Sequence, residues 1–455
     1  GNSPYDSSSA FAGSPLLIGL HDLVEQGLLA KSDLKAPKKL SEATAAVYQE
    51  AIRFKDARLR SAYERFEADA SSEQRAEFES FKATAASWLD SYSLFTALKH
   101  HTNQQAWFQW PSELRSRKTS ALKRVRQELV SEVEYCCFQQ FQFDRQWRGL
   151  RAHCARHGIR LLGDVPMFVA HDGADVWEHQ QLFFLDEEGQ RTFMAGVPPD
   201  YFSEDGQLWG NPLYRWSVLQ QDGYAWWIAR LEQTLERFDA LRLDHFIAFH
   251  RYWEIPGGAT SAKQGRFVKV PGKDFFKKVR KKLGGLPFVA EDLGLITPKV
   301  QELRDQFELP GMRVLQFGFS AGAEVYQPHR YPPRALAYTG THDNDTLVGW
   351  LDAKPNDSAA EPTWQAERER ALSYVGSGKN AKDRHWSMIR ALMMSVANTT
   401  IFPLQDVLGL DTSARMNVPG TPTGNWTWRV SHEQLGAAVA KRMRTLSELY
   451  ERLPK

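Results

Sequence analysis

Apolar and polar positions follow one period in the first third of the chain and another beyond it. In the first third, apolar residues recur every three or four positions between charged ones, the pattern of amphipathic helices. Residues 42–70, 72–98 and 119–154 show it most clearly, and residues 107–111 interrupt them as a loop. We therefore expect a helical block before the rest of the fold.

Beyond residue 155 the chain has short apolar runs separated by long stretches, which is typical of a parallel α/β sheet or barrel. Five of the six runs end in polar, glycine-containing or acidic residues, where α/β barrels carry their catalytic groups. Six strands are two fewer than a closed eight-stranded barrel contains. The predicted strands are residues 160–164, 239–244, 287–291, 313–317, 335–339 and 400–404.

Two long segments lack a regular period. Residues 167–216 are rich in Gly, Pro, Asp and aromatic residues, and residues 255–272 contain two Pro-Gly pairs. Long irregular segments in compact domains are usually functional, so we expect the first to be a lid or acceptor segment and the second a mobile loop near the site. The predicted organisation is the start of a catalytic barrel region (1–20), a helical insertion (21–152) and the catalytic barrel (153–455).

The charge and the cysteines exclude several classes of protein. A net charge of +2 over 455 residues provides no basic surface for nucleic acid or for a membrane. No apolar run is long enough to cross a membrane. Cys136, Cys137 and Cys154 are odd in number and two are adjacent, which does not fit a disulfide-bonded secreted scaffold. We therefore expect a cytoplasmic protein.

Motifs for phosphate, metal or serine chemistry are missing from the sequence. It has no glycine-rich phosphate loop with its lysine and no nucleophile-elbow serine. His153 and His157 are four residues apart on a predicted helix, but no second pair of ligands accompanies them. His171 and Asp172 would suit a catalytic triad, but no activated serine or cysteine goes with them. We expect neither a metal nor a cofactor.

The second predicted strand ends in a pair of charged residues. Strand alternation places Arg242 and Asp244 on one face, opposite Leu241 and Leu243. An arginine at that position lowers the pKa of the aspartate and keeps it ionised as a nucleophile. A structural ion pair inside a barrel would give the same pattern, so both interpretations stay open for this motif alone.

Two further strand ends carry acids. Glu291 follows an apolar run and is a candidate general acid/base, provided that burial raises its pKa. Asp292 points the other way along the strand and is expected to be structural. His342 and Asp343 lie in a polar cluster after the fifth strand, where they could hold sugar hydroxyls and favour ring distortion. The alternative is ordinary helix capping, with Asp345 capping the next helix.

The three acidic motifs together favour catalysis, because all lie at the same end of one predicted sheet. Retaining glycosidases need two carboxyl groups only about 5 Å apart. The chain also has 15 tryptophans, and aromatic rings are the surfaces that proteins present to the apolar faces of sugars.

These residues resemble the catalytic signatures of the amylomaltases, the 4-α-glucanotransferases or disproportionating enzymes of glycoside hydrolase family 77. The resemblance rests on Arg-Leu-Asp-His at 242–245, Ala-Glu-Asp-Leu-Gly at 290–294 and Thr-His-Asp-Asn-Asp-Thr at 341–346. Their order and spacing agree with the family, and the similarity covers nearly the whole chain. Further matches are residues 3–5, 9–13, 163–166, 169–177, 195–203, 206–212, 414–417 and 424–426.

By that resemblance the protein transfers α-1,4-glucan segments to the 4-hydroxyl of a glucan or glucose, and its partners are α-1,4-glucans and maltooligosaccharides. Asp244 would be the nucleophile, Glu291 the acid/base and Asp343 the carboxylate that stabilises the distorted sugar. The resemblance implies substrate-binding roles for Arg242, His245 and His342 at the same subsite, Tyr5 on the donor ring, Tyr201, Phe202, Gln207 and Trp209 on the acceptor side, and also Asn417 and Asp172.

The resemblance also implies a TIM-type (β/α)8 barrel, a large helical insertion and long loop subdomains. In the family a strand, a helix and a second strand precede the Ser-Pro-Tyr motif found here at residues 3–5, and this sequence carries none of them. We therefore expect six of the eight strands. Two other functions remain open at this point: a maltodextrin hydrolase with the same carboxylates, and a truncated glucan-binding protein without turnover.

Overall fold

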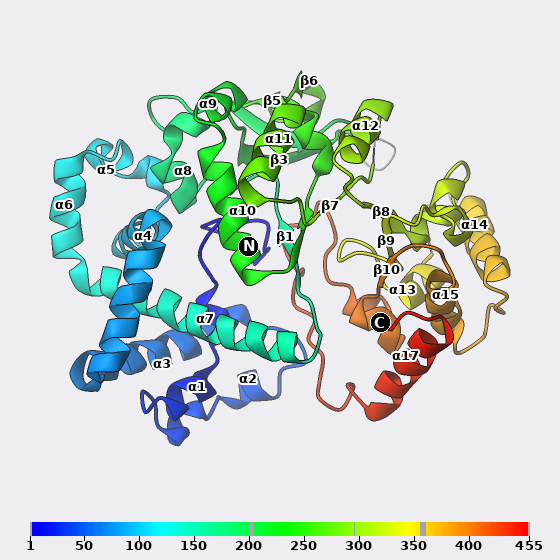
Figure 1. Ribbon diagram of the computed structural model, residues 1–455, viewed down its shortest axis with the longest axis horizontal. Coiled ribbons are helices and arrows are strands. Elements are labelled where there is room, and N and C mark those ends of the chain that lie inside the picture. Colours follow the sequence, from blue (N-terminus) through cyan, green and yellow to red (C-terminus); the bar gives the residue numbers. More distant parts are fainter. Residues whose placement is uncertain (1, 200–203, 295, 355–360, 454–455) are drawn as a thin grey trace.

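The computed structural model describes residues 2–199, 204–294, 296–354 and 361–453. Figure 1 shows a block of helices on the left, a set of antiparallel strands at the top and the C-terminal helices on the right, with parallel strands between them. Among the described residues, none of the helices combines the length and apolarity that crossing a membrane requires.

A parallel sheet of six strands forms the centre of the fold, in the order β1-β4-β7-β8-β9-β10. The register places Asp164 beside Arg242 and Leu243 beside Ala290, so the carboxyl ends of these strands share one edge. The six predicted strands are confirmed as this sheet, and the arrangement is that of an α/β barrel-type fold. The strands are β1 (Leu162–Val165), β4 (Ala240–Leu243), β7 (Phe288–Ala290), β8 (Gly311–Val314), β9 (Ala335–Tyr338) and β10 (Thr399–Ile401).

Two strand boundaries were predicted wrongly. The run 313–317 is a strand only to Val314, and a 3₁₀ helix follows it at Leu315–Phe319. This 3₁₀ helix lets the side-chain amide of Gln316 donate to the backbone carbonyl of Asp345, 2.8 Å away. The run 400–404 is a strand only to Ile401, because Pro403 has no N–H for the sheet and α16 (Leu404–Leu408) begins directly after it.

The expected helical block is present, with different helix limits. The helix expected over 42–70 begins only at Tyr48, because Ala45 pairs with Trp428 in an isolated bridge and Ala46 donates to the carbonyl of Thr427. The helix expected over 119–154 is two helices that meet at Leu129. The block contains α1 (Leu20–Glu25), α2 (Lys38–Ser41), α3 (Tyr48–Asp69), α4 (Ser72–His101), α5 (Ser112–Arg115), α6 (Thr119–Glu128) and α7 (Val130–Arg156).

The two segments expected to be irregular contribute to a second sheet, which is antiparallel and has the strand order β3-β2-β5-β6. Gly196 fits there because a Cβ would come within 2.2 Å of the Gln207 carbonyl oxygen on the neighbouring strand. The sheet lies above the parallel strands in Figure 1. Its strands are β2 (Phe193–Val197), β3 (Gln207–Pro212), β5 (Arg251–Pro256) and β6 (Arg266–Lys269).

Apolar packing joins the helical block to the sheet. One buried cluster extends from Phe66 and Trp88 in the block to Trp226 and Phe276, and a second lies under the C-terminal helices around Trp386. The division at residues 20 and 152 stays a prediction. The remaining helices are α8 (Ala174–Glu178), α9 (Trp216–Gln221), α10 (Ala225–Arg237), α11 (Gly272–Leu283), α12 (Pro298–Gln306), α13 (Leu347–Asp352), α14 (Glu361–Tyr374), α15 (Arg384–Met393) and α17 (Ala437–Leu449).

Candidate active site

The carboxyl ends of β1, β4 and β7 bring acidic and basic side chains to one place. Asp164 lies on β1 and Arg242 on β4, while Asp244 and Glu291 follow the last residues of β4 and β7. The parallel pairing continues past the strands, because the Asp244 amide donates to the carbonyl of Val165 at 3.1 Å and the Glu291 amide to that of Leu243 at 3.1 Å. The two acids therefore extend from neighbouring strands at the same edge.

Arg242 is the centre of this group of side chains. Its Nε and Nη2 donate to the two carboxylate oxygens of Asp164 at 3.0 and 2.9 Å, a bidentate pair. Nη2 also donates to Asp244 Oδ1 at 2.8 Å and to the Tyr5 hydroxyl at 2.9 Å. The arginine side chain is only 11% exposed, so these contacts hold it in one position.

The pKa of Asp244 differs from the prediction. Loss of water around the carboxyl raises its pKa to about 7, and the charges of Asp164 and Asp343 also raise it. Arg242 lowers the pKa, as the sequence indicated, but does not outweigh burial. The expectation that Arg242 keeps this pKa low was therefore wrong, because the acids of other strands were not visible in the motif.

Glu291 is the second acid of the pair, and its surroundings favour the protonated form. Burial, and then the charge of Asp244, raise the pKa of Glu291 well above its usual range. The backbone N–H of His245 donates to Glu291 Oε2 at 2.8 Å. His245 has a φ of 48°, a left-handed conformation that is uncommon for a residue with a side chain. The charge of an ionised Asp244 therefore favours a protonated Glu291 beside it.

The loop after β9 brings His342 and Asp343 to the same group. His342 Nε2 lies 3.1 Å from the Tyr5 hydroxyl and 3.5 Å from Asp343 Oδ2. The amide of Asn417 donates to Asp343 Oδ1 at 2.6 Å, and Arg415 donates to the Asp343 backbone carbonyl at 2.7 Å. We call Tyr5, Asp164, Arg242, Asp244, Glu291, His342 and Asp343 the strand-end cluster.

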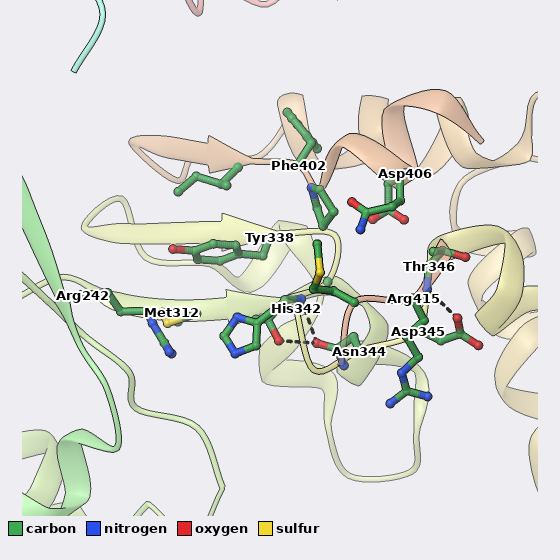
Figure 2. Close-up of a pocket in the computed structure, with 16 residues that line it drawn as sticks. Arg242, Met312, Tyr338, His342, Asn344, Asp345, Thr346, Phe402, Asp406 and Arg415 are labelled. Carbon is green, nitrogen blue, oxygen red and sulfur yellow. Dashed lines mark hydrogen bonds between the residues drawn. The ribbon is translucent and has the colours of Figure 1, made fainter. Parts of the chain in front are cut away.

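A cavity of about 260 Å³ lies beside the strand-end cluster. Figure 2 shows it with His342 and Asn344 on one side and Phe402 and Asp406 on the other. Arg242 also lines it, so the cavity and the cluster share residues.

Comparisons with known proteins agree with the motifs. A family model described as 4-α-glucanotransferase matches residues 1–434. The chain belongs to this family. The 4-α-glucanotransferase of Thermus thermophilus is 45% identical over 457 residues, covering 100% of this chain and 89% of that protein. The Synechocystis 4-α-glucanotransferase is 42% identical over 99% of this chain and 88% of its own length.

A solved structure of the family resembles the whole fold. The amylomaltase of Streptococcus agalactiae, determined in complex with acarbose, has a TM-score of 0.92 and 32% identity to this chain. The match covers 99% of this chain and 89% of the amylomaltase chain. The barrel-type fold expected from the strand pattern is therefore the fold of the 4-α-glucanotransferase family.

Three residues of this family member belong to the site although the motif analysis gave them no role. Asp164 contacts both Arg242 and Tyr5, at 2.6 Å from the Tyr5 hydroxyl. Arg415 holds Asp343, and the rings of Trp426 and His342 have centroids 5.3 Å apart. A carboxylate at the end of the first predicted strand was the available signal for Asp164.

Of the residues expected on the acceptor side, Trp209 contacts His245 and Gln207 contacts Trp209. The ring of Trp209 on β3 packs edge-on against His245 with centroids 4.8 Å apart, and its Nε1 donates to Gln207 Oε1 at 3.1 Å. Burial lowers the pKa of His245 to about 4, so the imidazole is neutral near pH 7. Tyr201 and Phe202 lie outside the described residues.

Asp172 has hydrogen-bonding partners in the helical block, and its substrate-binding role stays a prediction. Its Oδ2 pairs with Lys99 on α4 at 2.6 Å, and its Oδ1 accepts from the Trp107 amide at 3.1 Å. Both oxygens therefore bind the helical block to the segment after β1, which is a structural role. The prediction rested on residues 169–177, which resemble the family, and such a run contains structural side chains as well.

Two further acids have structural partners. Asp292, expected to be structural, is buried, pairs with Arg304 and accepts from the Met312 amide at 2.7 Å. The helix-cap interpretation of Asp345 was wrong, because Thr346 caps α13 by accepting from the Gly349 amide at 3.0 Å. Among the described residues, no three His, Cys, Asp or Glu side chains gather as metal ligands.

Proposed function

We propose that this family member is a retaining 4-α-glucanotransferase in which Asp244 is the nucleophile, Glu291 the acid/base and Asp343 the stabilising carboxylate. The observation that carries the assignment is the pairing of Asp244 and Glu291 at neighbouring strand ends. The charge of Asp244 raises the pKa of Glu291, which favours a proton on Glu291 beside an ionised Asp244. Environments that separate the protonation of two acids in this way are typical of an acid and a nucleophile.

In the first step, an oxygen of Asp244 attacks the anomeric carbon of an α-1,4-glucan and forms a covalent glycosyl ester. The bond from that carbon to the departing glucan oxygen breaks, and Glu291 gives its proton to this oxygen. The hydrogen bond from the His245 amide keeps the Glu291 carboxyl beside Asp244. The released fragment leaves with a new hydroxyl at its non-reducing end.

The second step restores both acids. Glu291, now a carboxylate, takes the proton from the 4-hydroxyl of an acceptor glucan or glucose, whose oxygen attacks the anomeric carbon and releases Asp244. Two inversions retain the α configuration. Water in place of the acceptor would give hydrolysis, so the outcome depends on the groups that bind the acceptor.

The other residues of the cluster bind the donor sugar. Arg242, His342, Asp343 and Asn417 present hydrogen-bonding groups, and Tyr5 presents an aromatic ring close to that of His342. Asp343 would accept hydrogen bonds from sugar hydroxyls, which strengthen as the ring distorts towards the transition state. Burial lowers the pKa of His342, so a neutral imidazole faces the sugar.

We assign the acceptor to the side formed by β3. Trp209 provides an aromatic surface beside His245, and Gln207 provides an amide that contacts Trp209. Tyr201 and Phe202 are proposed to belong to the same subsite. The cytoplasm is the proposed location, since Cys136, Cys137 and Cys154 are all free.

Incubation with maltotriose tests the proposed activity. Transfer produces glucose and a ladder of longer oligosaccharides, whereas hydrolysis produces only shorter sugars. A protein that binds maltooligosaccharides but forms no product would be a glucan-binding protein, and the proposal would be wrong. A fluorinated glucosyl fluoride that traps the ester, followed by peptide mass mapping, should place the label on Asp244. A label elsewhere would overturn the assignment of the nucleophile.

A further inference from the structure

The loop that carries His342 and Asp343 is closed by a single buried carboxylate. The loop begins after β9 and ends where α13 starts. At its first end, the Thr339 hydroxyl donates to Asp406 Oδ2 at 2.6 Å. At its second end, the Leu347 amide donates to Asp406 Oδ1 at 2.7 Å. Both oxygens of one side chain therefore hold the two ends of the loop.

Asp406 and its partners are shielded from water. Asp406 is 1% exposed, Thr339 is 0% exposed and Leu347 is 0% exposed. A buried donor that loses its acceptor destabilises the fold, because its hydrogen bond is not replaced. Loss of Asp406 as an acceptor would therefore weaken the positions of both loop ends.

Packing does not fix the loop by itself. The cavity of about 260 Å³ is lined by loop residues, among them Gly340 and Thr346, and by Asp406 from the opposite side. Within the loop, Asn344 Oδ1 accepts from the amide and hydroxyl of Thr341, both at 2.9 Å. Close packing normally limits movement in a protein interior, and an open space on one side removes that limit. Hydrogen bonds at the ends consequently add to the bonds from Gln316 and Asn417 in setting the position of the loop.

The segment that carries Asp406 also reaches the tip of the loop. Asp406 lies on α16, and Gln405 beside it donates to the Ala414 carbonyl at 3.2 Å. Three residues further, the Asn417 amide contacts Asp343 at 2.6 Å. One stretch of chain thus holds the loop at both ends and at the carboxylate that faces the substrate.

We propose that Asp406 is a positioning residue that acts on the reaction through the loop, by fixing Asp343 and His342 against the donor sugar. This inference rests on the function proposed above. Asp406 touches neither Asp244 nor Glu291 among its recorded contacts, so it takes no part in the chemical steps. Its contribution is the placement of groups that must fit the distorted sugar closely.

The first test is Asp406→Asn in the full chain, with kcat and KM measured separately for maltotriose. The amide presents an N–H₂ group to one of two donors, so one end of the loop loses its acceptor. We expect kcat to fall about 10²-fold, as for a small misplacement of catalytic groups, with a much smaller change in KM. Glu254→Gln is the matched control, since Glu254 is also buried but pairs with Arg266 in the antiparallel sheet.

Thr339 offers a second test that keeps Asp406 in place. Thr339→Val removes the hydroxyl without changing the volume much, and it should lower kcat in the same direction as Asp406→Asn. Thr339→Ser keeps the hydroxyl and should retain kcat within about twofold, because the hydrogen bond can still form. The comparison of Thr339→Val with Thr339→Ser tests the positioning role even if Asp406→Asn does not fold.

A double-variant experiment separates positioning from a general structural role. Asp406→Asn is combined with Asp343→Asn, and kcat is measured for both single variants and the double variant. The donor is α-maltosyl fluoride, whose fluoride leaves with less acid assistance. If Asp406 acts through the loop, the second change adds little, since residues in one network are not additive. Full additivity of the two changes would overturn the positioning role, and so would an unchanged kcat in both Asp406→Asn and Thr339→Val. In either case, turnover by the wild-type chain would leave the proposed function standing. An inactive wild-type chain would instead overturn both proposals.

Discussion

The strand-end cluster and the proposed acceptor side, which meet at His245, are built in opposite ways. Arg242 makes four hydrogen bonds to three side chains and is 11% exposed. Trp209 on β3 is 38% exposed, and within the described part of the chain its indole N–H donates to Gln207 alone. One side of the site is therefore fixed by several buried contacts, and the other presents an open aromatic surface.

The contrast agrees with what a transferase needs. Charge develops at the anomeric carbon in every cycle, and prearranged groups stabilise it best when they do not have to reorganise. The acceptor changes from one cycle to the next, from glucose to a long glucan. An aromatic ring with few partners can contact any of these sugars. Substitutions on the two sides should therefore differ in size and in kind.

The largest effect is expected from Asp244→Asn. The amide has nearly the same shape and cannot form the glycosyl ester, so kcat/KM for maltotriose should fall by at least about 10⁴-fold. Binding of maltooligosaccharides, followed by tryptophan fluorescence, should persist, because Trp426 and Trp209 are unchanged. Residual transfer above about one per cent of the wild-type rate would show that Asp244 is not the nucleophile.

Arg242→Lys tests whether the strand-end cluster depends on geometry as well as charge. Lysine keeps the charge but cannot make the bidentate pair with Asp164 while also reaching Asp244 and Tyr5. We expect kcat to fall by about 10² to 10³-fold, comparable to the loss of a preorganised catalytic donor. Arg266→Lys is the control from the antiparallel sheet, because Arg266 is 74% exposed and pairs with Glu254. Equal losses in both variants would contradict the contrast.

The sequence predicted the strand ends well because each motif is local. The apolar runs and the acids that follow them placed Asp244, Glu291 and Asp343 at one edge, and the parallel register confirmed that edge. The antiparallel sheet was missed because β2 pairs with β5, whose residues lie about sixty positions later in the chain. Glycines and prolines in those segments favoured an irregular structure.

The pKa values and ion pairs were the other features that local sequence patterns could not predict. Arg242 two residues before Asp244 favoured a low pKa, yet burial and acids from β1 and the loop after β9 raise it. The partner of Asp172 was not visible in its motif for a related reason, since Lys99 comes from the helical block. Charges brought together by the fold are absent from any single motif.

The pH dependence of kcat/KM should show how the acids of the strand-end cluster raise one another's pKa. Asp244 must be ionised to attack, and its pKa is raised to about 7. The rate should therefore fall about tenfold for each pH unit below 7. Glu291 must stay protonated, and its pKa is raised well above its usual range, so the rate should fall again at the pH where Glu291 ionises. Asp164→Asn removes a charge that raises the pKa of Asp244 and should move the acid limb to lower pH, whereas a wild-type limb near pH 4 would contradict this account.

The smallest expected effect is a change in the fate of the glycosyl ester. Trp209→Ala removes the ring beside His245 but leaves the contacts of Arg242 in place, so the first step should be nearly unchanged. The acceptor loses its aromatic surface, and water then competes better, by about tenfold in the ratio of hydrolysis to transfer from maltotriose. Leu208→Ala is the matched control, because Leu208 is 41% exposed and alternates with Trp209 along β3. If both variants keep the wild-type ratio, β3 does not select the acceptor. If instead Trp209→Ala lowers the rate of ester formation as strongly as Arg242→Lys, the ring supports Glu291 through His245. The two sides of the site would then act as one unit.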